Sequence, residues 1–169
     1  MRCMRIFCIL WGSLIALFIT GCGTKHYTVN EPKLITLKTP KLKFADTGYL
    51  RHDGSAVEIE LFTAGVAVEK ISIDTLVCVS SGCMSEEAFV KTYLYPDYPY
   101  DTMRQVLLGN DIFGGKGSSE MCNGTRYQYI RNEEMDIVYR RKAHEIYFKD
   151  RLNGLLIQIN DLDTNQSLP

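Results

Sequence analysis

The residues of this chain that could do chemistry are scattered, and few stand at a spacing that catalysis requires. The stretch Gly114-Gly115-Lys116-Gly117-Ser118-Ser119 is rich in glycine, but it lacks the G-x-x-x-x-G-K-[ST] spacing of a phosphate-binding loop and does not lie between a strand and a helix. It therefore predicts a mobile loop. His26, His52 and His144 are dispersed over polar segments without ligand spacing, so we expect no metal.

Two further catalytic patterns are also incomplete. Glu58 and Glu60 could form a pair of carboxylic acids such as glycosidases use, but they alternate with the apolar residues of an expected strand. That alternation predicts that both carboxylates lie on a solvated sheet face. No serine lies in a G-x-S-x-G motif, and no base accompanies one. We therefore expect a protein that is not an enzyme and uses no cofactor.

The first 22 residues have the layout of an export signal. Arg2 and Arg5 provide a positively charged start, and an apolar core of 14 residues, 6–19, follows. This core is shorter than the roughly 20 residues that a membrane-spanning helix needs. Small residues then precede a cysteine in the run Ile19-Thr20-Gly21-Cys22.

This run resembles the lipobox of bacterial lipoprotein signals. The resemblance implies that residues 1–21 are removed and that Cys22 is acylated on its thiol and on its new amino group, which anchors the chain in a membrane. An ordinary secretory signal cleaved near Gly21 and an uncleaved anchor helix are the alternatives. Many inner-membrane lipoproteins carry Asp at the next position, so Gly23 favours the outer membrane, with the periplasmic or surface face left open.

Three cysteines remain beyond Cys22. Cys78 and Cys83 flank Val79-Ser80-Ser81-Gly82, which can form a tight turn. Because thiols outside the cytoplasm tend to pair, we expect a Cys78–Cys83 disulfide and a free Cys122, although pairings with Cys122 stay open. The spacing is not the C-x-x-C of thiol oxidoreductases, so the expected role is structural.

Length and charge restrict the remaining possibilities. Of the 19 basic residues two lie in the signal, which leaves 17 basic against 20 acidic residues, interleaved along the chain. This balance gives no expectation of nucleic-acid binding. We expect a lipidated flexible tether over residues 22–33, one β-rich domain over 34–160 and a flexible tail over 161–169.

Hydrophobic periodicity predicts a mainly β (α+β) domain. Period-two alternation predicts early strands, and the Asn153-Gly154 pair indicates a late hairpin. Ser85 is a good helix N-cap, and a proline-containing segment, 95–99, separates two short helices. The result is an antiparallel curved sheet or incomplete barrel with two helices inserted midway. The expected strands are 34–38, 42–51, 55–63, 66–74, 75–80, 126–131, 135–141, 145–150 and 155–160; the expected helices are 85–94 and 101–108.

This order of elements, with local features at Gly48, Tyr93-Leu94-Tyr95-Pro96, Val106-Leu107-Leu108-Gly109 and Tyr129 to Tyr139, weakly resembles the lipoprotein-carrier fold of the Lol system, LolA and LolB. The resemblance implies a half-barrel whose helices cover an apolar cavity for lipid or lipoprotein acyl chains. Residues expected around that cavity are Val57, Ile59, Leu61, Phe89, Tyr93, Leu94, Val106, Leu107, Ile137, Tyr139 and Ile157.

Two features depart from that family. The outer-membrane receptor projects an apolar residue from a long loop between early strands, whereas Thr63-Ala64-Gly65 is short, and a cysteine pair is not expected there. The alternative function is therefore a surface or periplasmic protein-interaction module without a lipid cavity, whose protein partner is unknown.

The tail contains one modification motif. Asp163-Thr164-Asn165-Gln166-Ser167 matches the extended N-glycosylation sequon of ε-proteobacteria. Together with the lipobox it suggests an ε-proteobacterial type of lipoprotein, in which we expect a glycan on Asn165. Asn123-Gly124-Thr125 has only the minimal motif, because Met121 stands where the extended form requires an acid.

Overall fold

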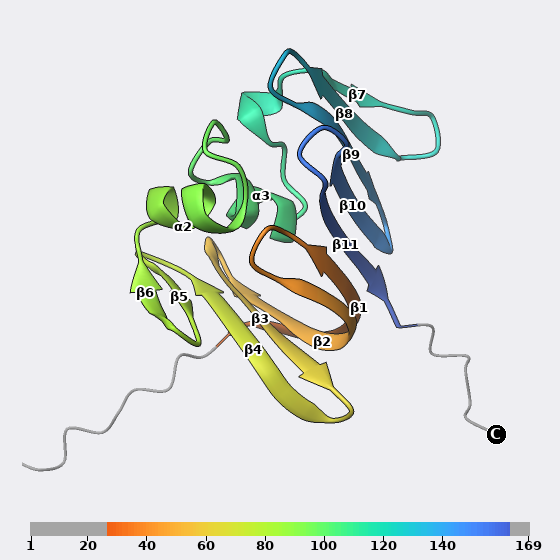
Figure 1. Cartoon of the computed structure of the whole chain (residues 1–169). Helices are drawn as coiled ribbons and strands as arrows, with labels where there is room; N and C mark the ends of the chain where they lie inside the picture. Colours follow the sequence, from red (N-terminus) through yellow and green to blue (C-terminus); the bar gives the residue numbers. More distant parts are fainter. Residues whose placement is uncertain (1–26, 163–169) are drawn as a thin grey trace, which may run out of the picture.

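A single antiparallel sheet of eleven strands dominates the computed structural model, which describes residues 27–162 (Figure 1). The predicted sites at Cys22 and Asn165 lie outside these residues. The first six strands are β1 (Val29–Lys38), β2 (Lys43–Asp53), β3 (Ala56–Thr63), β4 (Val66–Ile73), β5 (Val77–Val79) and β6 (Gly82–Met84). The last five are β7 (Ser118–Glu120), β8 (Arg126–Arg131), β9 (Asp136–Lys142), β10 (Glu145–Asp150) and β11 (Leu155–Asp161).

The sheet consists of two meanders that meet at its centre. Its strand order is β6-β5-β4-β3-β2-β1-β11-β10-β9-β8-β7, so the pairing of β1 with β11 joins the halves. Ile35 lies opposite Ile159 there, and Leu37 lies opposite Ile157. The short strands β6 and β7 form the two edges, and the curled sheet does not close. This arrangement confirms the predicted fold class.

Two short helices lie against the concave face (Figure 1). Helix α2 (Glu86–Tyr93) begins after Ser85, whose hydroxyl accepts a hydrogen bond from the backbone N–H of Ala88 at 3.2 Å. Helix α3 (Thr102–Leu107) has no side-chain cap. Because isolated helices of this length are unstable in water, both depend on packing against the sheet. The 3₁₀ turn η1 (Phe113–Gly115) follows them.

The core lies between the helices and the concave face. Alternate residues of the strands point into it, and the buried faces of both helices complete it. All residues expected to face the interior belong to this cluster or, for Tyr93, pack against it. They are Val57, Ile59, Leu61, Ile137, Tyr139 and Ile157 from the sheet, and Phe89, Tyr93, Leu94, Val106 and Leu107 from the helices.

Gly48 permits a close approach of β2 to its neighbours β1 and β3. A Cβ atom at this position would lie 2.6 Å from the carbonyl oxygen of Glu60 and 2.8 Å from Cδ1 of Ile35. Any side chain would therefore push β2 away from its neighbours. A glycine inside a strand commonly marks such a close approach.

The first strand begins earlier than the sequence predicts. Residues 29–33, expected within the tether, are part of β1, and Val29 pairs with His52 of β2. The segment is polar and has no hydrophobic periodicity, which is why the sequence predicts a tether there. The β1–β11 ladder ends at Lys33, however, so Pro32 removes no hydrogen-bond donor from it. Within residues 27–162, no helix is long and apolar enough to cross a membrane.

Candidate functional site

The space between the helices and the sheet is filled by side chains at its centre. Phe89 of α2 and both Val106 and Leu107 of α3 are almost fully buried. The ring of Phe89 also stacks on that of Tyr93, with 4.7 Å between ring centres. The helices therefore form a packed cover.

A pocket of about 230 Å3 opens at one end of this cover, beside the C-terminus of α3. Its base is apolar, and buried Leu50, Leu107 and Ile159 in it also belong to the core. The pocket is smaller than the roughly 300–1,000 Å3 typical of ligand sites. Its other lining residues are Glu31, Lys33, His52, Leu108, Gly109, Arg141, Lys142, Ala143, His144, Glu145, Ile146 and Asp161.

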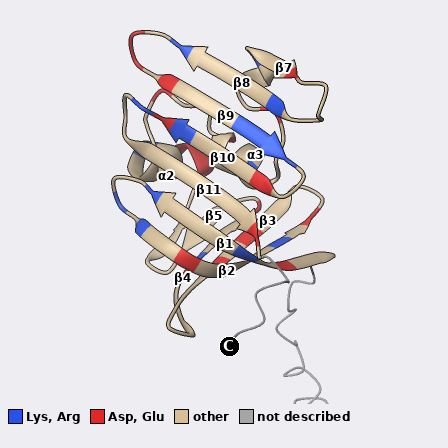
Figure 2. Ribbon diagram, turned by 90° about the vertical axis from the view of Figure 1, so that its right-hand side faces the viewer, with Lys and Arg blue, Asp and Glu red and all other residues tan. Residues whose placement is uncertain are grey.

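Charges on the rim of the pocket neutralise one another. Lys33 Nζ lies 2.5 Å from Asp161 Oδ1 and from Glu31 Oε2, and His144 Nδ1 lies 2.7 Å from Asp161 Oδ2. Hydrogen bonds from Lys33 and His144 hold the pKa of Asp161 below its usual value. Across the outer sheet face, too, basic and acidic residues are interspersed (Figure 2). An apolar base with a balanced rim suits an uncharged or apolar ligand.

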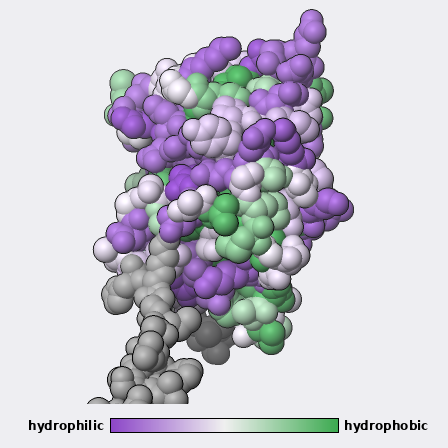
Figure 3. Space-filling view, turned by 90° about the vertical axis from the view of Figure 1, so that its left-hand side faces the viewer, coloured by the Kyte–Doolittle hydropathy of each residue, from purple (hydrophilic) through white to green (hydrophobic). Residues whose placement is uncertain are grey.

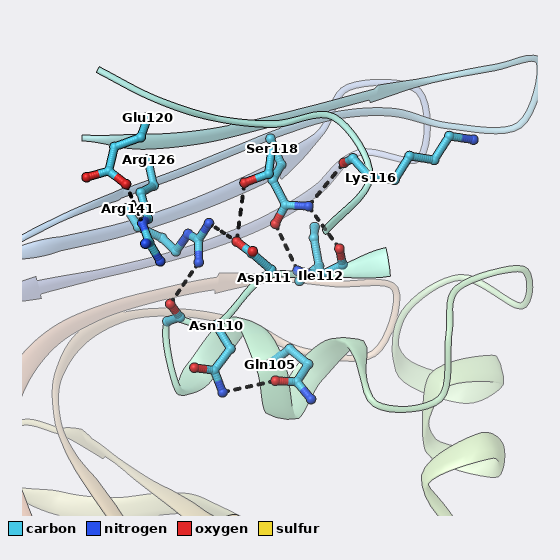
Figure 4. Close-up of polar contacts among 11 residues, drawn as sticks. Gln105, Asn110, Asp111, Ile112, Lys116, Ser118, Glu120, Arg126 and Arg141 are labelled. Atoms are coloured by element: carbon cyan, nitrogen blue, oxygen red, sulfur yellow. Dashed lines mark hydrogen bonds and ion pairs between the residues drawn. The ribbon is translucent and has the colours of Figure 1, made fainter. Parts of the chain in front are cut away.

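Two side chains of the sheet hold the segment that follows α3 (Figure 4). Arg141 pairs with Asp111 and donates a 3.1 Å hydrogen bond to the Gly109 carbonyl. Gln128 is fully buried and bonds both the N–H and the C=O of Ile112, at 2.8 and 2.9 Å. The loop predicted to be mobile is thus anchored, and η1 and β7 form within it. Its glycines supply positive φ angles for tight turns.

Two further polar contacts fasten the helices, and neither is predictable from the sequence pattern. Arg104 of α3 pairs with Glu86 of α2 at 2.6 Å and donates to the backbone carbonyls of Ser55 and Asp74. Buried Tyr98, between the helices, donates to Asp150 of β10 at 2.5 Å. Their partners are distant in sequence, and no local motif marks them.

The prediction for Glu58 is wrong. This side chain is only 5% exposed, although it lies on the outer face of the sheet. Its carboxylate pairs with Arg51 at 2.9 Å and Lys70 at 2.8 Å and accepts a 3.2 Å hydrogen bond from Tyr27. Long side chains from neighbouring strands cover it, which period-two alternation does not reveal. Glu60 shares Arg51, so the two acids form an ion-pair cluster.

The predicted Cys78–Cys83 pairing is confirmed. Cys78 and Cys83 lie opposite each other on β5 and β6 and form a disulfide, whereas Cys122 is free and exposed. Within residues 27–162, no group of three or more His, Cys, Asp or Glu residues is arranged to hold a metal ion.

Two wider depressions lie away from the concave face. One, of about 610 Å3, is lined by residues 123–125 and 142–145. The other, of about 380 Å3, lies beside the Glu58 cluster and includes Lys70 and Asp74. No residue of the hydrophobic core lines either depression, whereas Leu50, Leu107 and Ile159 line the smaller pocket beside α3, which is therefore the better candidate for a chain that enters the interior.

The hairpin of β3 and β4 carries the most exposed apolar residues of the early strands. It projects beyond the rest of the sheet (Figure 1), and hydrophobic side chains gather at this end of the molecule (Figure 3). Val66 is 65% exposed and Val68 is 51% exposed. Exposed apolar residues grouped in this way commonly mark a contact with a membrane or protein.

No family model matches the chain, and neither a curated protein nor a solved structure matches it. Functional inference therefore depends on the pocket, its polar surroundings and the exposed hairpin.

Proposed function

We propose that this protein is a non-enzymatic lipoprotein, anchored by its N-terminal lipid in the outer membrane, that binds an apolar chain between its sheet and its helices. The ligand class is the acyl chain of a lipid or of another lipoprotein. The observation that carries the proposal is the pocket beside α3, whose base of Leu50, Leu107 and Ile159 is continuous with the core.

Binding of a long chain requires α3 to move, because the pocket alone is small. The short length of this helix supports the proposal. The helix has only six residues and no side-chain cap, and its polar attachment is concentrated in one side chain, Arg104, which pairs with Glu86 and donates to the carbonyls of Ser55 and Asp74. A ligand that enters replaces apolar side-chain contacts with apolar ligand contacts, so the buried apolar area is kept.

The β3–β4 hairpin supports contact with a lipid surface. Its turn, Thr63-Ala64-Gly65, is shorter than the loop that the resemblance to the Lol receptor implies. The strands themselves nevertheless carry Val66 and Val68 to an exposed tip. Two valines that are costly to expose to water would be accommodated in the apolar boundary of a bilayer.

The packed centre of the core favours a second candidate. With no room for a chain under the helices, the protein would be an interaction module that presents the same hairpin to a protein partner. Both the acyl-chain carrier and the interaction module would use exposed apolar residues. They differ in whether the helices move away from the sheet to admit a ligand.

Uptake of a fluorescent fatty acid tests the proposal. The chain should be purified as Cys22→Ser, so that it carries no acyl group of its own, and bound lipid should be sought by mass spectrometry. Leu108 lines the pocket but is only half-buried, so Leu108→Asn should weaken uptake with little change in Tm. Buried Leu107→Asn should lower both.

If the wild-type interior takes up no acyl probe and yields no lipid, the carrier function is wrong and the interaction module is the better explanation. Anchoring has its own test. Cys22→Ala should release the chain from membranes or leave it uncleaved, and a mature membrane-bound variant would contradict lipidation.

A further inference from the structure

Two buried hydrogen-bonding atoms on the concave side of β9 have no partner within the described chain. They are the hydroxyl oxygen of Tyr139 and Nε of Arg141. The residues stand two apart on one strand, so their side chains share a face. Cζ of Arg141 lies 5.0 Å from the centre of the Tyr139 ring. Tyr139 is 0% exposed and Arg141 is 6% exposed.

The hydroxyl of Tyr139 has no role in packing. Phenylalanine would fill the same space without burying an unpaired polar group, which folded proteins generally avoid. The ring already packs edge-to-face on Phe148, with 6.2 Å between ring centres. The hydroxyl at this position is therefore available to a partner from outside the chain.

The charges around these atoms restrict what that partner is. The guanidinium of Arg141 is already neutralised by Asp111 and donates to the Gly109 carbonyl. The two atoms without any partner are one N–H donor and one hydroxyl, beside a guanidinium whose positive charge Asp111 balances. An uncharged acceptor fits both, whereas a carboxylate would be repelled by Asp111. Burial raises the pKa of Tyr139, which keeps its hydroxyl a donor.

The position of the two groups connects them to the pocket beside α3. Arg141 lines that pocket together with Leu107 and Gly109, and Tyr139 lies two residues further along β9 within the core. Tyr139 itself does not line the pocket, so a polar group on a chain over the apolar base meets Arg141 at the lining and reaches Tyr139 once the chain extends further beneath α3.

We propose that Tyr139 and Arg141 bind the ester or amide carbonyl of an acyl chain held in this pocket. The inference rests on the proposed function and narrows the ligand to acylated molecules, such as glycerolipids or acylated cysteine. Free fatty acids and hydrocarbons would bind more weakly. Arg141 also holds the segment after α3, so Tyr139 is the cleaner target for substitution.

Competition among probes of similar length tests the assignment. Methyl decanoate, decanoic acid and undecane would displace a bound apolar fluorophore from the full chain carrying Cys22→Ser. The ester should bind most tightly. Tyr139→Phe should weaken ester binding about 3- to 10-fold, the usual effect of one hydrogen bond, and leave undecane binding unchanged. Tyr147→Phe, on the outer face, should change neither.

The thermal melt of Tyr139→Phe is the second measurement. Its Tm should equal or exceed that of the wild type, because an unpaired buried hydroxyl is removed. A clearly lower Tm would mean that the hydroxyl has a structural partner and would overturn the proposal. Equal affinity for all three probes, or tightest binding of the acid, would overturn it while the apolar-chain function stands. If no probe binds to the wild type, the proposed function itself fails.

Discussion

The hydroxyl of Tyr98 donates a 2.5 Å hydrogen bond to the carboxylate of Asp150, which is completely buried at the end of β10. Tyr98 lies between α2 and α3, so the bond ties the helical cover to the C-terminal half of the sheet. Asp150 also accepts hydrogen bonds from the backbone N–H groups of Asp136, Leu152 and Asn153. The Asp150 carboxylate thus holds both the end of β10 and the segment between the two helices.

Tyr98→Phe should destabilise the protein by about 2 kcal/mol, because it removes a hydrogen bond to a charged group that is buried. Denaturant unfolding followed by circular dichroism measures this loss. Tyr100, two residues away, is exposed, so Tyr100→Phe should change stability by no more than about 0.5 kcal/mol and serves as the control. If the Tyr98 and Tyr100 variants are equally stable, the hydrogen bond from Tyr98 to Asp150 does not stabilise the fold.

Acid should weaken the same contact. Burial raises the pKa of Asp150, but hydrogen bonds from Tyr98, Asn153 and the backbone outweigh it and hold that pKa below its usual value. Since the folded pKa is the lower one, the stabilisation is present above the unfolded pKa of about 3.9 and is lost as pH falls below it. Asp150→Asn should therefore lose less stability than the wild type between pH 7 and pH 3. If urea unfolding shows the same loss of stability in Asp150→Asn and in the wild type over this pH range, Asp150 does not cause the pH dependence.

The fold was predictable from sequence where its signal is local. Val57, Ile59 and Leu61 alternate with polar residues, and burial of one sheet face follows from that period. Ser85 and the acidic residues after it likewise predict the start of α2. The order of strands and helices follows from such signals.

The polar contacts were not predictable because their partners are remote in sequence. Asp150 lies just before the Asn153-Gly154 turn and resembles a turn residue, whereas its partner Tyr98 is 52 positions away. The glycine-rich loop after α3 indicates mobility by composition alone. Its anchors, Gln128 and Arg141, become visible only when β8 and β9 are placed beside it.

Replacement of Glu58 should reveal its burial. Burial raises the pKa of Glu58, but Lys70 and Arg51 outweigh it and keep that pKa below the usual value. Glu58→Gln should cost about 1–2 kcal/mol, since both cations lose a partner but Lys70 is exposed and Arg51 keeps Glu60. Glu60→Gln is the matched control and should cost less than about 1 kcal/mol. A solvated Glu58 would make the two variants indistinguishable in denaturant unfolding.

The disulfide should contribute modestly to stability. It closes a short loop, with a sequence separation of 5, so Cys78→Ser combined with Cys83→Ser should lose about 2 kcal/mol in the chain-entropy model. Without reductant, exposed Cys122 should react with iodoacetamide in the native protein, whereas Cys78 and Cys83 should not. Peptide mapping that joins Cys122 to another cysteine would contradict this pairing.

The β3–β4 hairpin should contribute to lipid contact but not to folding. Val66 and Val68 are largely exposed, so replacing both with serine should change stability by no more than about 0.5 kcal/mol per site. In the chain carrying Cys22→Ser, the same double variant should bind less to phospholipid vesicles in a flotation assay, because the apolar tip is lost. Leu76→Ser provides the control, since Leu76 is similarly exposed but lies outside this hairpin. Equal flotation of all three chains would show that the hairpin does not contact lipid, and a protein partner would then be sought for it.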